Sequence, residues 1–187
     1  MIWAIKNNER IKAQPKEKAI CPLCNEEVIS KCGEIKIWHW SHKVDSECDS
    51  FGEPETEWHF NWKKQFPNEN QEVRMENHRA DIRSSEGIII ELQNSSITPE
   101  KIREREEFYK DMIWILNGET IAKNIEFYKQ RYKWKWFPES WRCVSKPIYI
   151  DLGDIFLYLL DISNSTFRKV SKDAFIIYHG GKPEWKK

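Results

Sequence analysis

The sequence predicts an α/β protein in which a mixed sheet is flanked by helices, with a small metal-binding module before it and an α+β extension after it. Residues 1–52 hold four of the five cysteines, which predicts the module. Residues 53–118 follow the order helix, strand, strand, helix, strand, which predicts the core. Residues 119–187 are aromatic and mixed in pattern, and we expect them to form the extension.

Composition restricts the class of protein. The chain has 187 residues, 40% of them hydrophobic and 32% charged, as is typical of a soluble globular protein. No apolar run approaches the roughly 18 residues of a membrane span, and the first residues lack a signal-peptide pattern. We therefore expect a cytoplasmic protein with no membrane partner. The formal net charge is zero, which neither requires nor excludes nucleic-acid binding.

The middle region begins with a predicted helix and a pair of strands. Pro54-Glu55-Thr56-Glu57 suits a helix N-terminus, and the helix is expected to continue to about Gln65. Val73 is expected to begin one strand that leads to Asp81 and Ile82. Ser84-Ser85-Glu86-Gly87 predicts a turn, and the β-branched run that starts at Ile88 predicts the next strand, through Gln93.

A second helix and a buried strand complete the core. Thr98 is a good N-cap and Pro99 fits the first turn, so a helix is expected through about Lys110. The continuous apolar run 112–116 is typical of a central strand that is buried on both faces. This order of elements matches the core of a restriction-endonuclease-like α/β fold.

The N-terminal cysteines have the spacing of a structural zinc site. The Cys-Pro-Leu-Cys sequence presents two thiolates to one ion, and zinc needs four nitrogen or sulfur ligands. His39 and His42 would point to opposite faces of a strand, so one of them is favoured. We favour the set of ligands that contains His42 and leave His39 as a substitute or a supporting residue. Cys32 and Cys143 are expected to be packing residues. The alternative to a zinc site is a group of buried free cysteines. The five candidates are Cys21, Cys24, His39, His42 and Cys48, and the favoured four are Cys21, Cys24, His42 and Cys48.

A pair of acidic residues predicts a second kind of metal site. Asp81 and Glu91 are separated by nine residues that include the predicted turn, so they can converge on one divalent ion. Hard cations such as Mg²⁺ or Mn²⁺ prefer carboxylate oxygens. Gln93 shares a face of the strand with Glu91 and can orient a water molecule. The alternative is a solvated strand edge.

The helix before these strands adds further candidates. Glu55, His59 and Lys63 are spaced i, i+4, i+8, so they lie on one face. Glu55 would complete the metal shell, His59 would assist proton transfer and Lys63 would supply positive charge. The alternative is a charged face exposed to solvent, with Trp58 and Trp62 facing the core.

Polar residues further along the chain are candidates for substrate contacts. Ser95 follows the glutamine, and Arg105 and Tyr109 lie four residues apart on the second helix. Lys133 and Lys135 would share one face of a strand, with Trp134 and Trp136 on the other. The lysines either contact phosphates or form the solvated face of a half-buried strand.

The order of these motifs resembles that of the CoiA-like competence nucleases. Members of this family look like PD-(D/E)XK nucleases with an N-terminal zinc-finger-like segment, and the motif lysine stands where this chain has Gln93. The resemblance covers residues 18–118 well and continues more weakly to Phe175. The motifs that carry it are Cys-Pro-Leu-Cys, Trp38–His42, Glu55-Thr56 with His59 and Lys63, Arg79-Ala80-Asp81, Glu91-x-Gln93-x-Ser95, Arg105 with Tyr109, and Trp114–Leu116.

Motifs and resemblance together predict a nuclease with structural Zn²⁺ and catalytic Mg²⁺ or Mn²⁺ that hydrolyses DNA phosphodiester bonds. DNA is the expected partner, with a homodimer or an accessory protein as a further possibility. Two alternatives stay open. One is a non-catalytic zinc-containing nucleic-acid-binding module, and the other is a zinc-stabilised adaptor that binds proteins and does not depend on a divalent metal.

Overall fold

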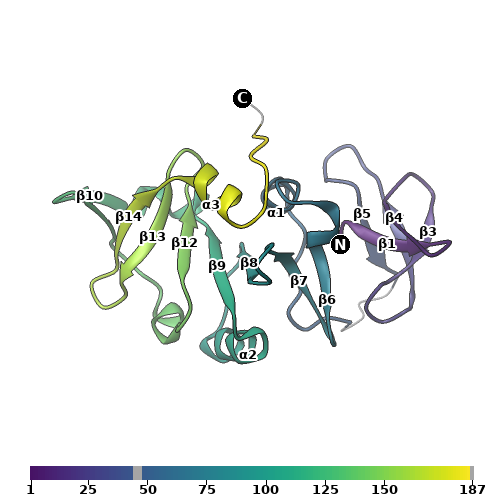
Figure 1. The fold of residues 1–187 in the computed structure, drawn as a ribbon, viewed down its shortest axis with the longest axis horizontal. Helices are drawn as coiled ribbons and strands as arrows, with labels where there is room; N and C mark the ends of the chain where they lie inside the picture. The colour runs from purple at the N-terminus through teal and green to yellow at the C-terminus, as the bar shows by residue number, and fades with distance from the viewer. Residues whose placement is uncertain (44–47, 186–187) are drawn as a thin grey trace. The chain divides into compact units, whose positions relative to one another are not determined.

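The computed structural model describes residues 1–43 and 48–185 (Figure 1). The chain divides into two compact units, Met1–Ile82 and Arg83–Lys187. The first unit contains a five-stranded sheet followed by a helix and a β-hairpin. The second contains a larger mixed sheet with helices on both of its faces.

The five-stranded sheet of the first unit is antiparallel throughout, in the order β2-β1-β3-β4-β5. Its core consists mainly of small side chains, with Trp40 as the large one. The strands are β1 (Trp3–Lys6), β2 (Glu9–Lys12), β3 (Lys18–Ile20), β4 (Glu27–Lys31) and β5 (His39–His42).

Helix α1 (Glu57–Lys63), the short 3-10 helix η1 (Asn68–Asn70) and strands β6 (Gln71–Met75) and β7 (His78–Arg83) follow. The N-cap of α1 is Thr56, whose side chain accepts a hydrogen bond from the backbone N–H of His59. The helix therefore begins at the last residue of the predicted N-terminal segment and ends two residues earlier than the sequence predicts.

The predicted single strand from Val73 to Ile82 is wrong, because the chain forms a hairpin there. Met75 pairs with His78 across a two-residue loop of Glu76 and Asn77. Glu76 has a φ of 53°, a left-handed conformation that reverses the chain, and asparagine is a frequent turn residue. Neither glycine nor proline marks this turn in the sequence, so the local pattern does not predict it.

Several contacts tie this hairpin to the five-stranded sheet. The carboxylate of Asp49 accepts from the backbone N–H of Arg79 at 3.1 Å and lies 3.0 Å from Nδ1 of His78. Arg10 donates to the backbone oxygens of Asn68 and Gln71 at 2.9 and 2.7 Å. The sheet, the helix and the hairpin are therefore one packed unit.

The second unit is built on a seven-strand run in the order β10-β11-β14-β13-β12-β9-β8. Strands β8, β9 and β12 are parallel to one another, and the other neighbours are antiparallel. The strands are β8 (Ile89–Gln93), β9 (Met112–Asn117), β10 (Ile125–Tyr128), β11 (Arg131–Trp134), β12 (Ile148–Asp151), β13 (Phe156–Asp161) and β14 (Thr166–Val170). The strands of residues 119–187 thus continue the sheet that β8 and β9 begin.

The helices of this unit lie on opposite faces of its sheet. The indole N–H of Trp114 on β9 donates a hydrogen bond to the Glu106 carboxylate on α2 (Pro99–Tyr109). The Tyr149 ring on β12 packs instead on the Phe175 ring of α3 (Lys172–Tyr178). Ile148 is the β-partner of Trp114, so Trp114 and Tyr149 face opposite sides because successive side chains alternate. The 3-10 helices η2 (Glu119–Asn124) and η3 (Glu139–Cys143) complete the unit, and the predicted α/β class with a mixed sheet flanked by helices is confirmed.

The predicted turn and second helix are present as expected. Ser84 donates its backbone N–H to the carbonyl of Ile88 at 2.8 Å, and Gly87 takes the left-handed φ of 87° that glycine tolerates. The side chain of Thr98 caps α2, and Pro99 occupies its first turn. Within the described residues, no helix combines the length and apolar character needed to cross a membrane.

Candidate metal centre and candidate active site

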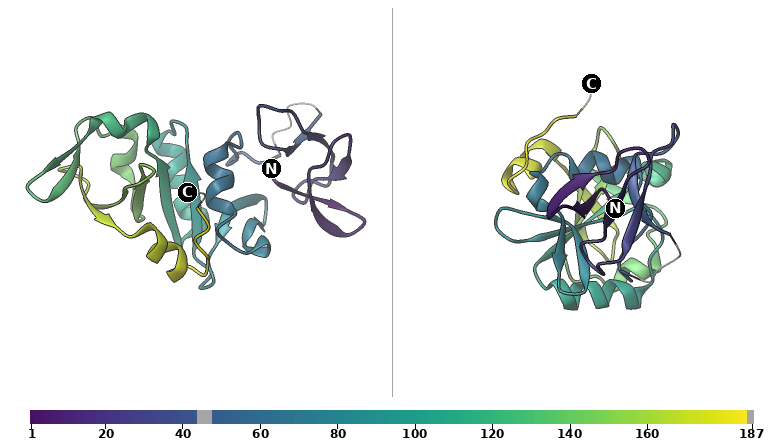
Figure 2. Two further views of the ribbon diagram at one scale, coloured as in Figure 1. Left: turned by 90° about the horizontal axis from the view of Figure 1, so that it is seen from above. Right: turned by 90° about the vertical axis from the view of Figure 1, so that its right-hand side faces the viewer.

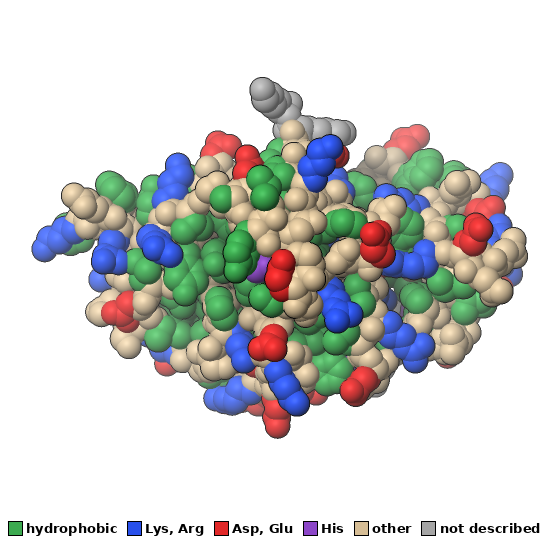
Figure 3. Space-filling view, in the orientation of Figure 1, with side chains coloured by type: hydrophobic (Ala, Val, Ile, Leu, Met, Phe, Trp, Pro, Cys, Tyr) green, Lys and Arg blue, Asp and Glu red, His purple; other side chains and the backbone are tan. Residues whose placement is uncertain are grey.

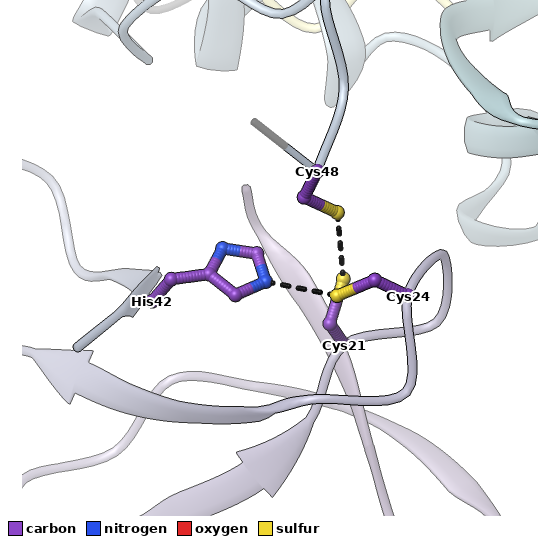
Figure 4. A group of neighbouring side chains, drawn as sticks. All are labelled: Cys21, Cys24, His42 and Cys48. Atoms are coloured by element: carbon purple, nitrogen blue, oxygen red, sulfur yellow. Dashed lines mark hydrogen bonds between the residues drawn. The ribbon is translucent and has the colours of Figure 1, made fainter. Parts of the chain in front are cut away.

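Four predicted zinc ligands come together in the first unit. The ligand atoms of Cys21, Cys24, His42 and Cys48 all lie within 4.8 Å of one another. Figure 4 shows their side chains pointing toward a common centre. The sulfurs of Cys21 and Cys48 are 3.7 Å apart, and the sulfur of Cys24 is 3.2 Å from Nε2 of His42.

This spacing fits a tetrahedral zinc ion. Bonds of about 2.3 Å to sulfur at tetrahedral angles place two sulfurs roughly 3.8 Å apart, close to the separation of Cys21 and Cys48. Burial lowers the pKa of His42, which favours the neutral imidazole that a metal requires. Burial and the neighbouring thiols raise the pKa of Cys48, so three thiols packed together favour a bound cation. The Cys₃His cluster can hold a zinc ion.

The other N-terminal candidates lie outside this cluster. His39 is three residues before His42 on β5, and its Nδ1 is 2.8 Å from the backbone oxygen of Ile37. The strand alternation that separates the two histidines is the one expected from the sequence. Cys32 packs against the sheet core, and the Cys143 thiol donates to the backbone oxygen of Ser140 at 3.2 Å.

A buried lysine surrounded by carboxylates is the central feature of the rest of this unit. Nζ of Lys63 lies 2.9 Å from Oδ1 of Asp81 and 3.0 Å from Oε2 of Glu55. It also lies 3.2 Å from Oε1 of Glu72. The Lys63 side chain is only 3% exposed, so the alternative of a solvated helix face is wrong for this residue and for His59, which is 2% exposed.

The charge state of this lysine follows from its surroundings. Burial alone would lower the pKa of the Lys63 ammonium, but three nearby carboxylates outweigh burial and raise it. Lys63 is therefore protonated across the physiological range. Glu55 lies two residues before the first helical residue, outside the helix on which it was expected, and its carboxylate still reaches Lys63, eight residues later.

Glu72 is a site residue that the sequence analysis missed. Its carboxylate accepts the backbone N–H groups of Ile2 at 2.8 Å and Trp3 at 3.1 Å, in addition to the bond from Lys63. Burial would raise the pKa of Glu72, but the neighbouring cations and these N–H donors hold it well below its ordinary range. A φ of 47° at this position is an uncommon backbone conformation for glutamate. Glu72 thus links the first strand to Lys63, and nothing in the sequence marks it, because it stands between Gln71 and Val73 just before the predicted strand.

His59 is held by hydrogen bonds at both ring nitrogens. Its Nδ1 is 2.7 Å from the Thr56 hydroxyl and accepts the Thr56 backbone N–H at 3.3 Å. Its Nε2 lies 3.1 Å from a Glu53 carboxylate oxygen. Burial would lower the pKa of His59, but Glu53 and Asp81 raise it above its ordinary value. The histidine therefore keeps its Nε2 proton facing Glu53.

A hollow in the first unit lies beside both clusters. His42 and Cys48 of the metal cluster line it, as do Glu53 and Glu55 near Lys63. His39 and Arg79 are also part of its lining, which gives His39 a place near the candidate site without a ligand role.

The candidates of the second unit form their own buried group. Arg105 of α2 reaches Glu91 and Gln93 of β8, with its Nη1 at 3.3 Å from Oε2 of Glu91 and 3.2 Å from Oε1 of Gln93. The amide of Gln93 donates to the backbone oxygen of Ser95 at 3.0 Å. All three long side chains are buried, so Glu91 and Gln93 are not a solvated strand edge.

The remaining substrate candidates divide into buried and exposed residues. Tyr109 is buried on α2, one turn beyond Arg105. Lys133 and Lys135 are exposed. The expectation that Trp134 and Trp136 share a face is wrong, because β11 ends at Trp134, which is buried, whereas Trp136 is 66% exposed.

The structure is thus an α/β protein with a Cys₃His cluster that can hold a metal ion in one unit, and with buried carboxylates beside a lysine or an arginine in each unit. Residues 3–51 match the family model for the N-terminal domain of competence protein CoiA. Residues 56–160 match the family model for the nuclease-like domain of the same protein. The chain belongs to the CoiA family, as the order of its motifs predicts.

A characterised relative supports this assignment. The chain is 25% identical over 148 residues to the competence protein CoiA of Bacillus subtilis strain 168. The alignment covers 70% of this chain and 39% of the relative, so the chain spans about two fifths of that protein's length. No solved structure matches the chain.

Proposed function

We propose that this protein is a nuclease that hydrolyses DNA phosphodiester bonds with the help of Mg²⁺ or Mn²⁺. The observation that carries the proposal is the buried ammonium of Lys63 among the carboxylates of Glu55, Glu72 and Asp81. Burying charges is costly, and a structural core has little need of three acids around one base. Such groups are frequent in sites that handle charged substrates.

The donor chemistry suits a hard divalent cation. Asp81 and Glu91 are the proposed ligands, with Glu55 as a further oxygen donor; pairing Asp81 with Glu91 rests on their spacing in the sequence. When bound, such an ion polarises a phosphodiester and lowers the pKa of a water molecule.

The chain's own residues supply positive charge in two places. Lys63 is held protonated beside Asp81, where it can offset negative charge that develops on a phosphate. Arg105 lies beside Glu91 and Gln93, so the position where PD-(D/E)XK sites carry a lysine already has a cation next to it. A lysine at position 93 would place a second buried cation beside the Arg105 guanidinium, and the two positive charges would repel each other. The neutral glutamine avoids this repulsion. His59, with its Nε2 proton directed at Glu53, is the proposed proton carrier.

The test is cleavage by Asp81→Asn and by the parent protein with Mg²⁺ or Mn²⁺ on linear, circular and single-stranded DNA. Loss of one ligand oxygen charge should lower the rate by about 100-fold, or about 3 kcal/mol of transition-state stabilisation. Glu104→Gln, an exposed acid on α2 of the other unit, is the matched control and should cleave like the parent. Equal rates for Asp81→Asn and the parent would remove Asp81 from the site.

A second candidate is a non-catalytic nucleic-acid-binding module of cytoplasmic location. The observation that favours it is that the Lys63 ammonium already pairs with the carboxylates of Glu55, Glu72 and Asp81, so these carboxylates have a cation without a bound metal ion. In that case the parent protein would bind DNA and show no metal-dependent cleavage in the same assay.

A further inference from the structure

The hairpin of β10 and β11 lies at an edge of the second unit's sheet and exposes large aromatic side chains. Phe127 is 66% exposed, Tyr128 62% and Trp136 66%. In the view from above in Figure 2, this hairpin extends beyond the strands next to it. Exposed aromatic side chains at this density mark a binding surface more often than a bare solvent face.

This region is also strongly basic, although the whole chain is neutral. Residues 123–142 contain six Lys and Arg and two Glu, so their net charge is six minus two, or +4. Figure 3 shows Lys and Arg side chains among hydrophobic ones over the part of the unit that holds β10, β13 and β14. Concentrating cations here favours a polyanionic partner.

The surface contains a hollow, here called the β11 hollow. Its lining includes the cations Lys133, Lys135 and Arg142, with Trp136 and Asn164 beside them, and no Asp or Glu is among the described residues that line it. Nζ of Lys135 lies 5.2 Å from the centre of the Trp136 ring. Oε1 of Glu126 is 3.8 Å from Nζ of Lys135, and Oε2 of Glu139 is 2.8 Å from Nε of Arg142. Neither acid lines the hollow itself.

We propose that the β11 hollow binds single-stranded nucleic acid. The three cations would contact backbone phosphates, Asn164 would add a hydrogen bond, and an unpaired base would stack on Trp136. Stacking requires a base face that a duplex keeps covered, so an exposed tryptophan beside cations favours a single strand. Single-stranded nucleic acid would then be the substrate class of the proposed nuclease. Binding at the β11 hollow does not depend on that proposed function, but the statement that the bound strand is cleaved does.

The experiment measures fluorescence anisotropy of labelled 20-nucleotide oligo(dT) and oligo(U) and of a 20-base-pair duplex. No divalent cation is added and no chelator is used, so cleavage is suppressed and zinc is retained. The variants are Trp136→Leu, Trp136→Phe and the double variant Lys133→Ala/Lys135→Ala. Lys101→Ala/Lys182→Ala is the matched control, since both lysines are exposed in the same unit.

Trp136→Leu should weaken single-strand binding about tenfold because it removes the stacking surface, whereas Trp136→Phe should stay within about threefold of the parent. The lysine double variant should lower the slope of log affinity against log salt by about 1.4, and the control should bind like the parent. A preference for oligo(dT) or for oligo(U) identifies the natural strand.

Three results would overturn the inference. They are no binding by the parent, equal binding by Trp136→Leu and the parent, or a duplex preference that does not depend on Trp136. Unchanged circular dichroism of the variants shows that their fold is intact. If the parent protein shows no metal-dependent cleavage while Trp136→Leu loses binding, the nuclease assignment fails and this inference stands.

Discussion

The two units of this protein differ in what holds their sheets together. The hydrophobic cluster at the sheet of the first unit is built largely from side chains of one to four heavy atoms, with Trp40 as its large member, and Trp3 of β1 is buried as well. The core of the second unit contains large apolar side chains such as Trp114, Phe156 and Phe167, each at most 1% exposed. Small side chains bury little apolar area, so the first sheet gains less from the hydrophobic effect.

A metal ion held by the Cys₃His cluster would compensate for this difference. The Cys₃His cluster draws its ligands from the loop after β3, from β5 and from the segment after it, so one ion would join three parts of the first unit. The second unit needs no such link, because its sheet is covered by α2 and α3. We therefore expect the first unit to depend on a bound metal ion for folding and the second to depend on packing.

The largest expected effect comes from removing zinc. Structural zinc contributes on the order of 10 kcal/mol to the folding of a small module, so Cys21→Ser or chelation should unfold the five-stranded sheet. Hydrogen exchange should show loss of protection in β1–β5 while β8, β9 and β12 stay protected. Elemental analysis should find one zinc per chain. Unchanged protection of the first sheet after chelation would contradict the comparison.

The next effect concerns the buried cations. Lys63→Met leaves three carboxylates without their cation and should destabilise the protein by about 3–5 kcal/mol. Arg105→Met leaves only one carboxylate, that of Glu91, without its cation, and it also removes a hydrogen bond to the neutral amide of Gln93. The loss in free energy of unfolding should therefore be smaller than for Lys63→Met. Urea unfolding of both variants at pH 7 measures the difference. Equal costs would mean that Lys63 shares its charge with fewer carboxylates than the distances indicate.

The smallest effect is a pH dependence that arises from Glu72. Its pKa is depressed in the folded state, so its contribution is fully present above the unfolded value of about 4.3 and is lost as pH falls below that value. Glu72→Gln should cost roughly 1.5–3 kcal/mol at pH 7 and flatten the decline in stability at acidic pH. Glu126→Gln, an exposed acid, serves as the control. An unchanged acid profile in Glu72→Gln would show that another carboxylate dominates.

Local chemistry explains why much of the protein could be predicted. The Cys-Pro-Leu-Cys spacing, the cap at Thr98 and the apolar run of β9 each act over a few residues, and the structure has all of them. The strand geometry of β5 even separates His39 from His42 as alternation requires. The turn at Glu76 and Asn77 was missed because its left-handed backbone has no glycine to signal it.

The sequence by itself predicted the four members of the Cys₃His cluster, the α/β class and the family, because those features depend on residue types at short spacings. Only the tertiary structure decided that Lys63 and His59 are buried, that Glu72 joins them and that Trp136 is exposed. Burial depends on which elements pack against a residue from distant parts of the chain. A charged residue with the same local pattern is a solvated side chain on one surface and a buried ion partner on another.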